Sequence, residues 1–135
     1  MFHPRSAVPL SAVTDGTTNT IAFGEIVLSP RNEDRRGRYW NAENTNALVT
    51  TLFPPNSLRG DVLLGNSQRC VDAPYAPCLS ITGTGGRGLA VRSVHPTGAN
   101  ILLVDGSVRF VSNAVNQVTY KALGSRNGGE VLGEY

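Results

Sequence analysis

The sequence is poor in cysteine, histidine, lysine and long apolar runs. Its 135 residues include two cysteines, two histidines and one tryptophan, and Lys121 is the only lysine among 12 basic residues. No apolar run approaches the roughly 20 residues of a membrane-spanning helix, so we expect no membrane span in this chain. A net charge of +2, with basic and acidic residues interleaved, argues against nucleic-acid binding. Without a CxxC motif or a histidine near either cysteine, no metal site is expected.

Glycine and proline are abundant, with 15 and 8 residues respectively. This content predicts many turns and little continuous helix. We therefore expect an α+β, β-rich fold with an antiparallel sheet, long loops and one C-terminal helix. No shift in composition marks a second domain, so residues 1–135 are interpreted as a single domain.

The clearest local signal is an Asp-Gly pair between two apolar runs. Residues 101–104 and 108–111 flank Asp105-Gly106, a pair typical of tight type I′ turns, which predicts a hairpin over residues 100–111. A two-residue loop fixes the register, because opposite residues of a hairpin share a face. The predicted common face consists of Ile101, Leu103, Val108 and Phe110.

His95 precedes this hairpin and Asp105 lies in its turn. The five residues 100–104 span roughly 16 Å when extended, so we expect the two side chains at opposite ends of the hairpin and not as a catalytic pair. Asp105 is interpreted as a turn former. His95 is interpreted as a packed or hydrogen-bonded residue, with a metal ligand or a pH-sensitive contact as the alternative.

A second strand is predicted near residues 20–27, where apolar residues of high β propensity cluster. It would carry Glu25 on the face of Ile21 and Phe23 unless Gly24 marks a bulge. A carboxylate buried there would need a partner such as Arg92 or His95. Cation binding by Asp15 and Glu25 is the alternative, although their spacing matches no known loop pattern.

The other elements are predicted less sharply. Residues 29–37 are expected to be a solvated, charged loop. Residues 47–53 resemble a strand, and residues 54–87 are expected to be an irregular loop region. A helix is predicted near residues 114–123, capped by Ser112 or Asn113 and ended by Gly124. Its expected inward side chains are Val115, Val118 and Ala122.

Cys70 and Cys78 bracket a turn-rich segment in which a local disulfide would close a short loop. Two free buried thiols remain the alternative, because these residues alone do not identify the cellular compartment.

Several motifs, in order, resemble a large bacterial family of unknown function. It comprises the prepilin-type proteins named for a histidine followed, after nine residues, by Asp-Gly, the spacing from His95 to Asp105-Gly106. Residues 13–21 with Gly24-Glu25 are similar to the family's DGTSNTI…GE segment. Further landmarks in the same order are Arg36-Gly37-Arg38-Tyr39-Trp40-Asn41, Pro55-Asn56-Ser57, Ala76-Pro77-Cys78, Arg92-Ser93 and Gly128-Gly129-Glu130-Val131. The motif residues predicted to matter are Asp15, Gly16, Asn19, Glu25, Trp40, Arg92, His95, Asp105 and Gly106.

The resemblance implies a pseudopilin-like globular domain at the cell surface or outside the cell. In that compartment, the Cys70–Cys78 disulfide is favoured over free thiols. Family members usually begin with a prepilin leader and a long apolar helix, and Met1 resembles a position in the middle of such a protein.

On this resemblance, the expected role is a structural subunit of a homo-oligomer or filament, without catalysis and without a cofactor. A binding module for a carbohydrate or peptide, shaped by residues 54–87 and Trp40, is the alternative. An enzyme ranks third, because no nucleophile elbow, metal triad or informative pair of carboxylates is present.

Overall fold

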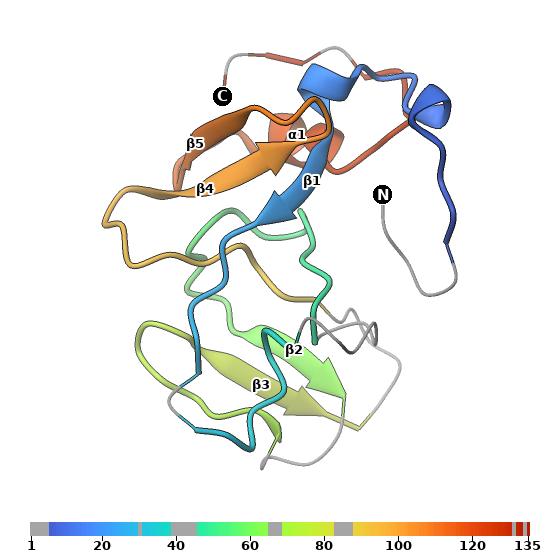
Figure 1. Cartoon of the computed structure of the whole chain (residues 1–135). Coiled ribbons are helices and arrows are strands. Elements are labelled where there is room, and N and C mark those ends of the chain that lie inside the picture. Colours follow the sequence, from blue (N-terminus) through green and yellow to red (C-terminus); the bar gives the residue numbers. More distant parts are fainter. Residues whose placement is uncertain are drawn as a thin grey trace.

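The structure is a computed structural model that describes residues 6–29, 31–38, 46–64, 69–82, 88–130, 132–133 and 135. Two small sheets lie one above the other and are joined by extended segments (Figure 1). The antiparallel sheet has the order β1–β4–β5, formed by β1 (Ile21–Gly24), β4 (Gly98–Leu103) and β5 (Val108–Ser112). The parallel sheet consists of β2 (Asp61–Leu64) and β3 (Cys78–Ile81).

Three short helical elements complete the described fold. The 3₁₀ turns η1 (Leu10–Ala12) and η2 (Thr17–Asn19) precede β1, and α1 (Gln117–Leu123) follows β5. These elements confirm the predicted α+β, β-rich class with a C-terminal helix. In the described part of the chain, no helix has the length and apolar character needed to cross a membrane.

The main core lies between the antiparallel sheet and α1. Inward side chains of all three strands meet Tyr120 and Leu123 of the helix, and the buried members are Ile21, Val91, Ala99, Ile101, Leu103, Val111, Tyr120 and Leu123. A smaller cluster around Leu63, Cys70 and Leu89 lies beside the parallel sheet. Val49 packs against both clusters and so connects the two halves.

The hairpin is confirmed, but its register differs by one residue from the prediction. Leu102 pairs with Val108, and Ile101 pairs with Arg109. The connection is a tight loop in which Gly106 N–H donates to Leu103 O at 3.0 Å and Gly106 has a φ of 89°. This pattern is a tight turn followed by a glycine bulge. An Asp-Gly pair is favoured in this loop as well as in a type I′ turn.

The shift moves two residues out of the predicted core, because a one-residue slip exchanges the two faces of a strand. Val108 is 65% exposed and Phe110 is 46% exposed, whereas Ile101 and Leu103 are buried. The predicted common face of these four residues is therefore wrong.

β1 is shorter than predicted and contains a bulge. Ile21 pairs with Leu103 and Phe23 pairs with Leu102, so one extra residue, Ala22, lies between the two pairs. Ile21 consequently faces the core, and Phe23, which is 61% exposed, faces outward. The predicted shared face of Ile21 and Phe23 is corrected, and the bulge lies at Ala22. Gly24 lies so close to Val91 that an added Cβ would overlap its side chain.

The C-terminal helix is confirmed with a later start. The Asn116 side chain accepts hydrogen bonds from the N–H groups of Val118 and Thr119, so Asn116 is the N-cap, and Ser112 and Asn113 are not. Gly124 caps the C-terminus as expected. The later start changes the buried stripe: Val118 is 77% exposed, while the buried residues of α1 are Tyr120, Ala122 and Leu123.

Two predictions for the middle of the chain are wrong. Residues 54–87 are not uniformly irregular, because they contain β2 and β3, which pair in parallel from Asp61–Cys78 to Leu64–Ile81. Residues 47–53 form no regular strand, and Val49 makes only an isolated bridge with Leu89. Whether each of these segments forms a strand depends on pairing partners distant in sequence, which a local sequence pattern does not reveal.

Candidate functional site

One face of the antiparallel sheet is not covered by the core. Because paired residues of antiparallel strands point to the same side, Phe23, Leu102 and Val108 form one row across the three strands. Asn100 and Phe110 form the next row. We call this the outer sheet face, defined by Phe23, Glu25, Asn100, Leu102, Val108 and Phe110 together with His95 beside it.

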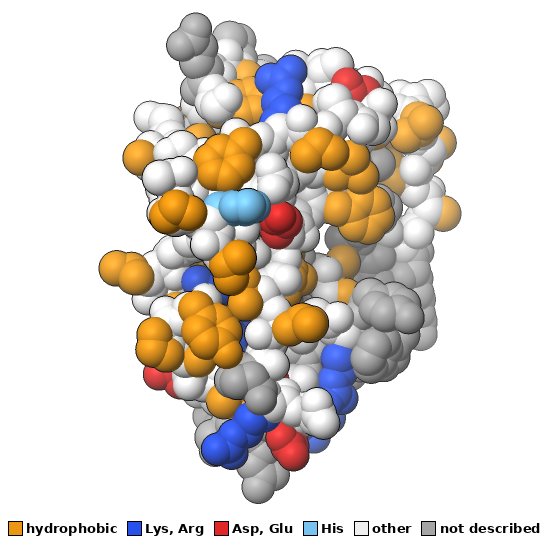
Figure 2. Space-filling view, turned by 60° about the vertical axis from the view of Figure 1, so that its left-hand side comes forward, with side chains coloured by type: hydrophobic (Ala, Val, Ile, Leu, Met, Phe, Trp, Pro, Cys, Tyr) orange, Lys and Arg blue, Asp and Glu red, His pale blue; other side chains and the backbone are white. Residues whose placement is uncertain are grey.

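A polar cluster lies in the middle of the outer sheet face. Glu25 accepts the backbone N–H of Asn100 at 2.7 Å and its side-chain N–H at 3.1 Å. His95 Nε2 lies 3.9 Å from Glu25 Oε1, and the His95 and Phe110 rings make a T-shaped contact with centroids 5.9 Å apart. His95 is thus the predicted partner of Glu25, whereas Arg92 is not. Figure 2 shows hydrophobic side chains around the pale blue histidine and its red acidic neighbour.

The Glu25 carboxyl is held in its ionised form. Burial acts to raise its pKa, but the hydrogen bonds from Asn100 and Ser93 and the charge of protonated His95 outweigh burial, so the pKa lies below its ordinary value. With half of the His95 side chain exposed, this is a solvated acid–imidazole pair at the surface.

Ser93, His95 and Glu25 lie close together, but their connections differ from those of a catalytic triad. In a triad, the histidine bonds the serine hydroxyl through one ring nitrogen and the acid through the other. Here Ser93 Oγ accepts the backbone N–H of His95 at 3.2 Å and its hydroxyl stabilises Glu25. The carboxylate therefore stands between serine and histidine, and no described bond lets the imidazole take a proton from the hydroxyl.

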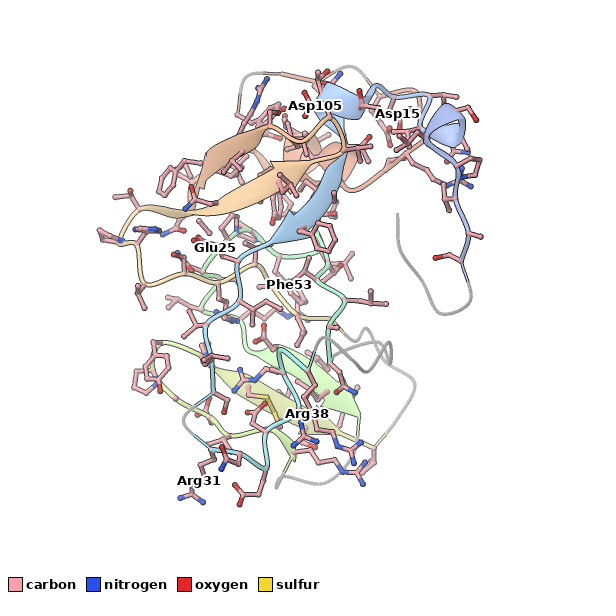
Figure 3. All side chains as sticks on the ribbon, in the orientation of Figure 1. Asp15, Glu25, Arg31, Arg38, Phe53 and Asp105 are labelled. Atoms are coloured by element: carbon pink, nitrogen blue, oxygen red, sulfur yellow. A yellow bond between two sulfur atoms is a disulfide. The ribbon has the colours of Figure 1, made fainter. Side chains whose placement is uncertain are left out.

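The two ends of the His95-to-Asp105 motif have separate partners. Asp105 Oδ1 accepts the N–H of Ser107 at 2.9 Å and its hydroxyl at 2.7 Å, which lowers the pKa of Asp105. Gly106 supplies the positive φ of the same turn. Figure 3 places Asp105 in the β4–β5 turn and Glu25, the neighbour of His95, at the other end of the sheet. The nine-residue spacing thus brackets β4.

A network of buried charges joins the loop that carries Asp34 and Arg36 to β2 and to the segment before β4. Asp34 and Arg36 are only 4% and 5% exposed, so the prediction of a solvated loop is wrong for them. Arg36 bonds Asp34 through Nε and Nη2 and reaches Asp61 Oδ2 through Nη1 at 3.0 Å. Asp61 in turn accepts Arg92 Nε at 3.0 Å and Nη2 at 2.9 Å. Alternating signs compensate each charge.

The protonation states of this network follow from its bonds. Burial acts to raise the pKa of Asp34, but Arg36 and the N–H of Val71 outweigh it and lower the pKa. Burial opposes the charge of Arg36, while Asp34 and Asp61 raise its pKa above the ordinary value. Both groups therefore stay charged inside the fold.

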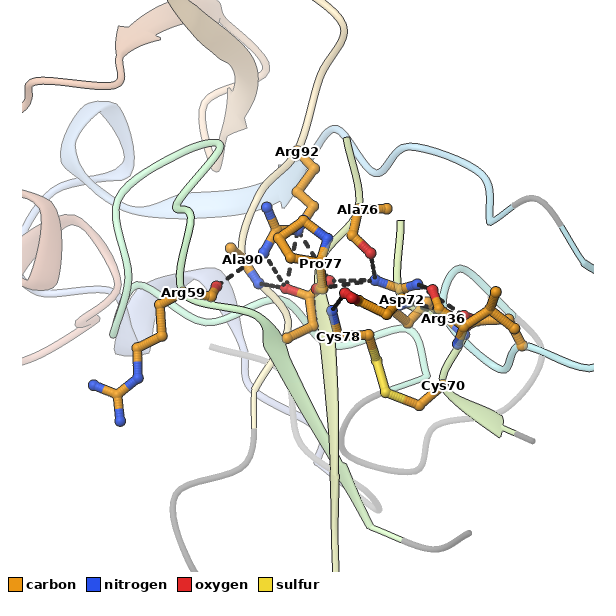
Figure 4. The surroundings of a disulfide bond; sticks show 12 residues. Arg36, Arg59, Cys70, Asp72, Ala76, Pro77, Cys78, Ala90 and Arg92 are labelled. Atoms are coloured by element: carbon orange, nitrogen blue, oxygen red, sulfur yellow. Dashed lines mark hydrogen bonds and ion pairs between the residues drawn. A yellow bond between two sulfur atoms is a disulfide. The ribbon is translucent and has the colours of Figure 1, made fainter. Parts of the chain in front are cut away.

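The disulfide lies beside this network (Figure 4). Cys70 and Cys78 are bonded, with Cα atoms 5.8 Å apart, which confirms the favoured pairing. The closed loop also delivers carbonyls to the buried arginine: Arg36 Nη1 donates to Ala76 O at 2.9 Å and to Pro77 O at 3.4 Å.

Asp15 joins the N-terminal part of the described chain to the C-terminal tail. Its carboxylate accepts the N–H of Gly128 at 2.8 Å and of Gly129 at 2.9 Å, and these bonds, that of Gly129 foremost, lower its pKa. Gly16 has a φ of 99°, and Asn19 donates back to the Asp15 carbonyl at 3.2 Å. The alternative, in which Asp15 and Glu25 together bind a cation, does not fit this structure. The two carboxylates lie apart (Figure 3), and each accepts hydrogen bonds from N–H donors.

Asn56 is an organising residue that the sequence analysis did not single out. It adopts a φ of 54°, and its side chain donates to Gly98 O and Asn113 Oδ1, both at 3.0 Å. Its Oδ1 accepts the N–H of Ser93 at 2.7 Å. The Pro-Asn-Ser landmark was the available signal, because asparagine tolerates this backbone region and bonds nearby main chain.

An apolar hollow of about 550 Å³ opens beside β1. Residues of β1, the segment after it and residues 47–51 line it, and no charged side chain is among the lining residues. Elsewhere, no group of three or more His, Cys, Asp or Glu side chains that could hold a metal occurs within the described ranges. Trp40, the other predicted contributor to a binding site, lies outside the described residues.

Comparison with family models identifies the protein family of the chain. The model SBP_bac_10, described as "Protein of unknown function (DUF1559)", matches residues 1–118. The chain belongs to this family. No curated protein and no solved structure matches the chain significantly. Asp15, Arg36, Asn56 and Arg92, which belong to the motifs quoted above, make contacts that organise this fold.

Proposed function

We propose that this DUF1559 domain is a structural subunit of an extracytoplasmic assembly, of the pilin-like or pseudopilin-like kind, and performs no catalysis. The observation that carries the proposal is the use of the motif side chains. They bond one another across the chain and converge on no reaction centre within the described ranges.

The contacts that the motif side chains make with distant segments support a structural role. Asp15 holds Gly128 and Gly129, and Arg36 holds the Ala76–Pro77 carbonyls. Arg92 Nη1 donates to Ser57 O at 2.8 Å. Each bond joins segments far apart in sequence, as a domain of few regular elements requires, because its loops otherwise lack ordering contacts.

The disulfide supports the extracytoplasmic part of the proposal. Structural disulfides persist in oxidising compartments and are rare in the cytosol. The bond closes a short loop against a buried ion network, as a permanent structural link does.

The proposal that no catalysis occurs rests on the polar cluster of the outer sheet face. Its carboxylate is satisfied by N–H donors, and its serine bonds the acid and not the imidazole. The imidazole, whose basicity suits activation of a serine hydroxyl at neutral pH, is therefore not in contact with the only hydroxyl of this cluster.

The proposal is tested by sedimentation velocity of the purified, oxidised protein at rising concentration, followed by negative-stain electron microscopy of the heavier fractions. Concentration-dependent growth into regular particles or fibres supports a structural subunit. Monomers at every concentration overturn the proposal.

A ligand-binding module is the second candidate, and the apolar hollow beside β1 favours it. The short name of the family model is also of the solute-binding type. The uncharged lining fits an apolar peptide side chain better than a charged solute. A thermal-shift screen with peptides and carbohydrates decides: a saturable rise in Tm with one class supports binding, since a ligand of the folded state stabilises it.

A further inference from the structure

We propose that the outer sheet face binds a second copy of this chain in a two-fold, face-to-face pair around Glu25 and His95. The proposal rests on the proposed structural role, which it deepens by naming the partner and the surface.

The first argument is the apolar character of a surface that the core leaves open. Val108, Phe110 and Phe23 are 65%, 46% and 61% exposed, although residues on the opposite face of the same strands, such as Val111 and Ile21, are buried. The two phenylalanines alone expose on the order of 200 Å² of apolar surface, taking about 200 Å² per ring. Leu102 and Val108 extend this apolar surface across all three strands, so that it is contiguous, as in the largest apolar patches of soluble monomers, which are often functional.

The second argument is area. A stable pair buries about 800 Å² per partner, with an apolar centre and a polar rim. The outer sheet face supplies such a centre, and the neighbouring loop that carries His95 supplies polar groups.

The third argument is charge complementarity. Glu25 Oε1 and His95 Nε2 lie 3.9 Å apart at the border of the apolar patch, where His95 contacts Phe110. A two-fold axis that lies in the interface, parallel to the sheet and at right angles to the line joining the two groups, passes above their midpoint and places Glu25 of each copy against His95 of the other. An isologous contact needs such self-complementarity, and an imidazole N–H donor facing a carboxylate acceptor provides it.

Glycine at position 98 is part of the same surface. A Cβ there would overlap the Val111 carbonyl and the Phe110 ring, so the ring lies against bare backbone. His95, in T-shaped contact with the Phe110 ring, adds a second neighbour on its side. The aromatic anchor is thus fixed before any partner binds, which reduces the entropy lost on association.

The test compares two matched substitutions by sedimentation equilibrium. Val108→Lys places an ammonium in the proposed interface, whereas Val118→Lys places it on α1, at a valine that is 77% exposed on another element. Because each pair would bury two unpaired charges, Val108→Lys is expected to raise the dissociation constant at least about tenfold, and Val118→Lys to leave it unchanged.

A second readout locates the contact directly. Backbone amide NMR shifts of the wild-type protein, followed on dilution, are expected to change in β1, β4 and β5 and to stay constant in α1. Equal dissociation constants for both variants, or shift changes confined to other elements, overturn the inference while leaving the proposed structural role standing. A monomer at all concentrations overturns both. A simple pair that never grows further supports the inference and contradicts the larger assembly.

Discussion

Replacing Asp61 with asparagine should be among the most damaging single changes to this fold. The carboxylate accepts four donors: Arg36 Nη1, Arg92 Nε, Arg92 Nη2 and the N–H of Ala90. The substituted amide keeps one acceptor oxygen but removes the negative charge, which leaves the buried network with an excess positive charge. Removing one member of a buried ion network costs about 3–5 kcal/mol, a large part of the 5–15 kcal/mol that stabilises a typical domain.

Asp72→Asn is the matched control. Asp72 is exposed and accepts one N–H, that of Cys78, at 2.9 Å, a bond that the amide oxygen can still make. We expect urea unfolding of the oxidised protein to show a midpoint about 2 M lower for Asp61→Asn, taking an m value of about 2 kcal/mol/M, and a nearly unchanged midpoint for Asp72→Asn. Midpoints of the two variants within about 0.5 M of each other would show that the buried network contributes little and would refute the reasoning.

Four further outcomes are expected. Gly98→Ala should lower the free energy of unfolding by about 1–3 kcal/mol through overpacking, and a neutral result in the same urea assay would contradict the tight backbone contact. Tyr120→Phe should be neutral or stabilising by up to about 1–2 kcal/mol, because the buried hydroxyl has no hydrogen-bond partner among the described residues; a clear loss would indicate a missed partner. Reducing Cys70–Cys78 should cost about 2–3 kcal/mol by loop entropy, measured by unfolding with and without reductant. The lowered pKa of Asp15 means that its contribution is present above its ordinary pKa of 3.8 and disappears as the pH falls through the lower folded value, so Asp15→Asn should reduce the acid sensitivity of unfolding.

Local signals in the sequence were sufficient to predict the elements that are determined by residues adjacent in the chain. The Asp105-Gly106 pair predicts the hairpin, but it suits two loop lengths. The burial of Val111, in place of Val108 and Phe110, on the face of Ile101 and Leu103 distinguishes them. The helix and its Gly124 stop follow from a short periodic pattern, although the cap lies at Asn116.

The buried ion network could not be predicted from local sequence. Arg36 lies in a run of mixed charges that is typical of solvated loops, and its partner Asp61 is 25 residues away. The near absence of lysine was the one available hint, because arginine is the residue that suits buried, bidentate ion pairs. The parallel pairing of β2 with β3 was likewise hidden, since it depends on contacts between distant segments.

The role as a structural subunit is tested most directly by negative-stain electron microscopy of the purified, oxidised protein at high concentration, alongside its Val118→Lys variant. Our account predicts regular particles or fibres in both samples. Uniformly dispersed particles of monomer size in the wild-type sample would contradict it.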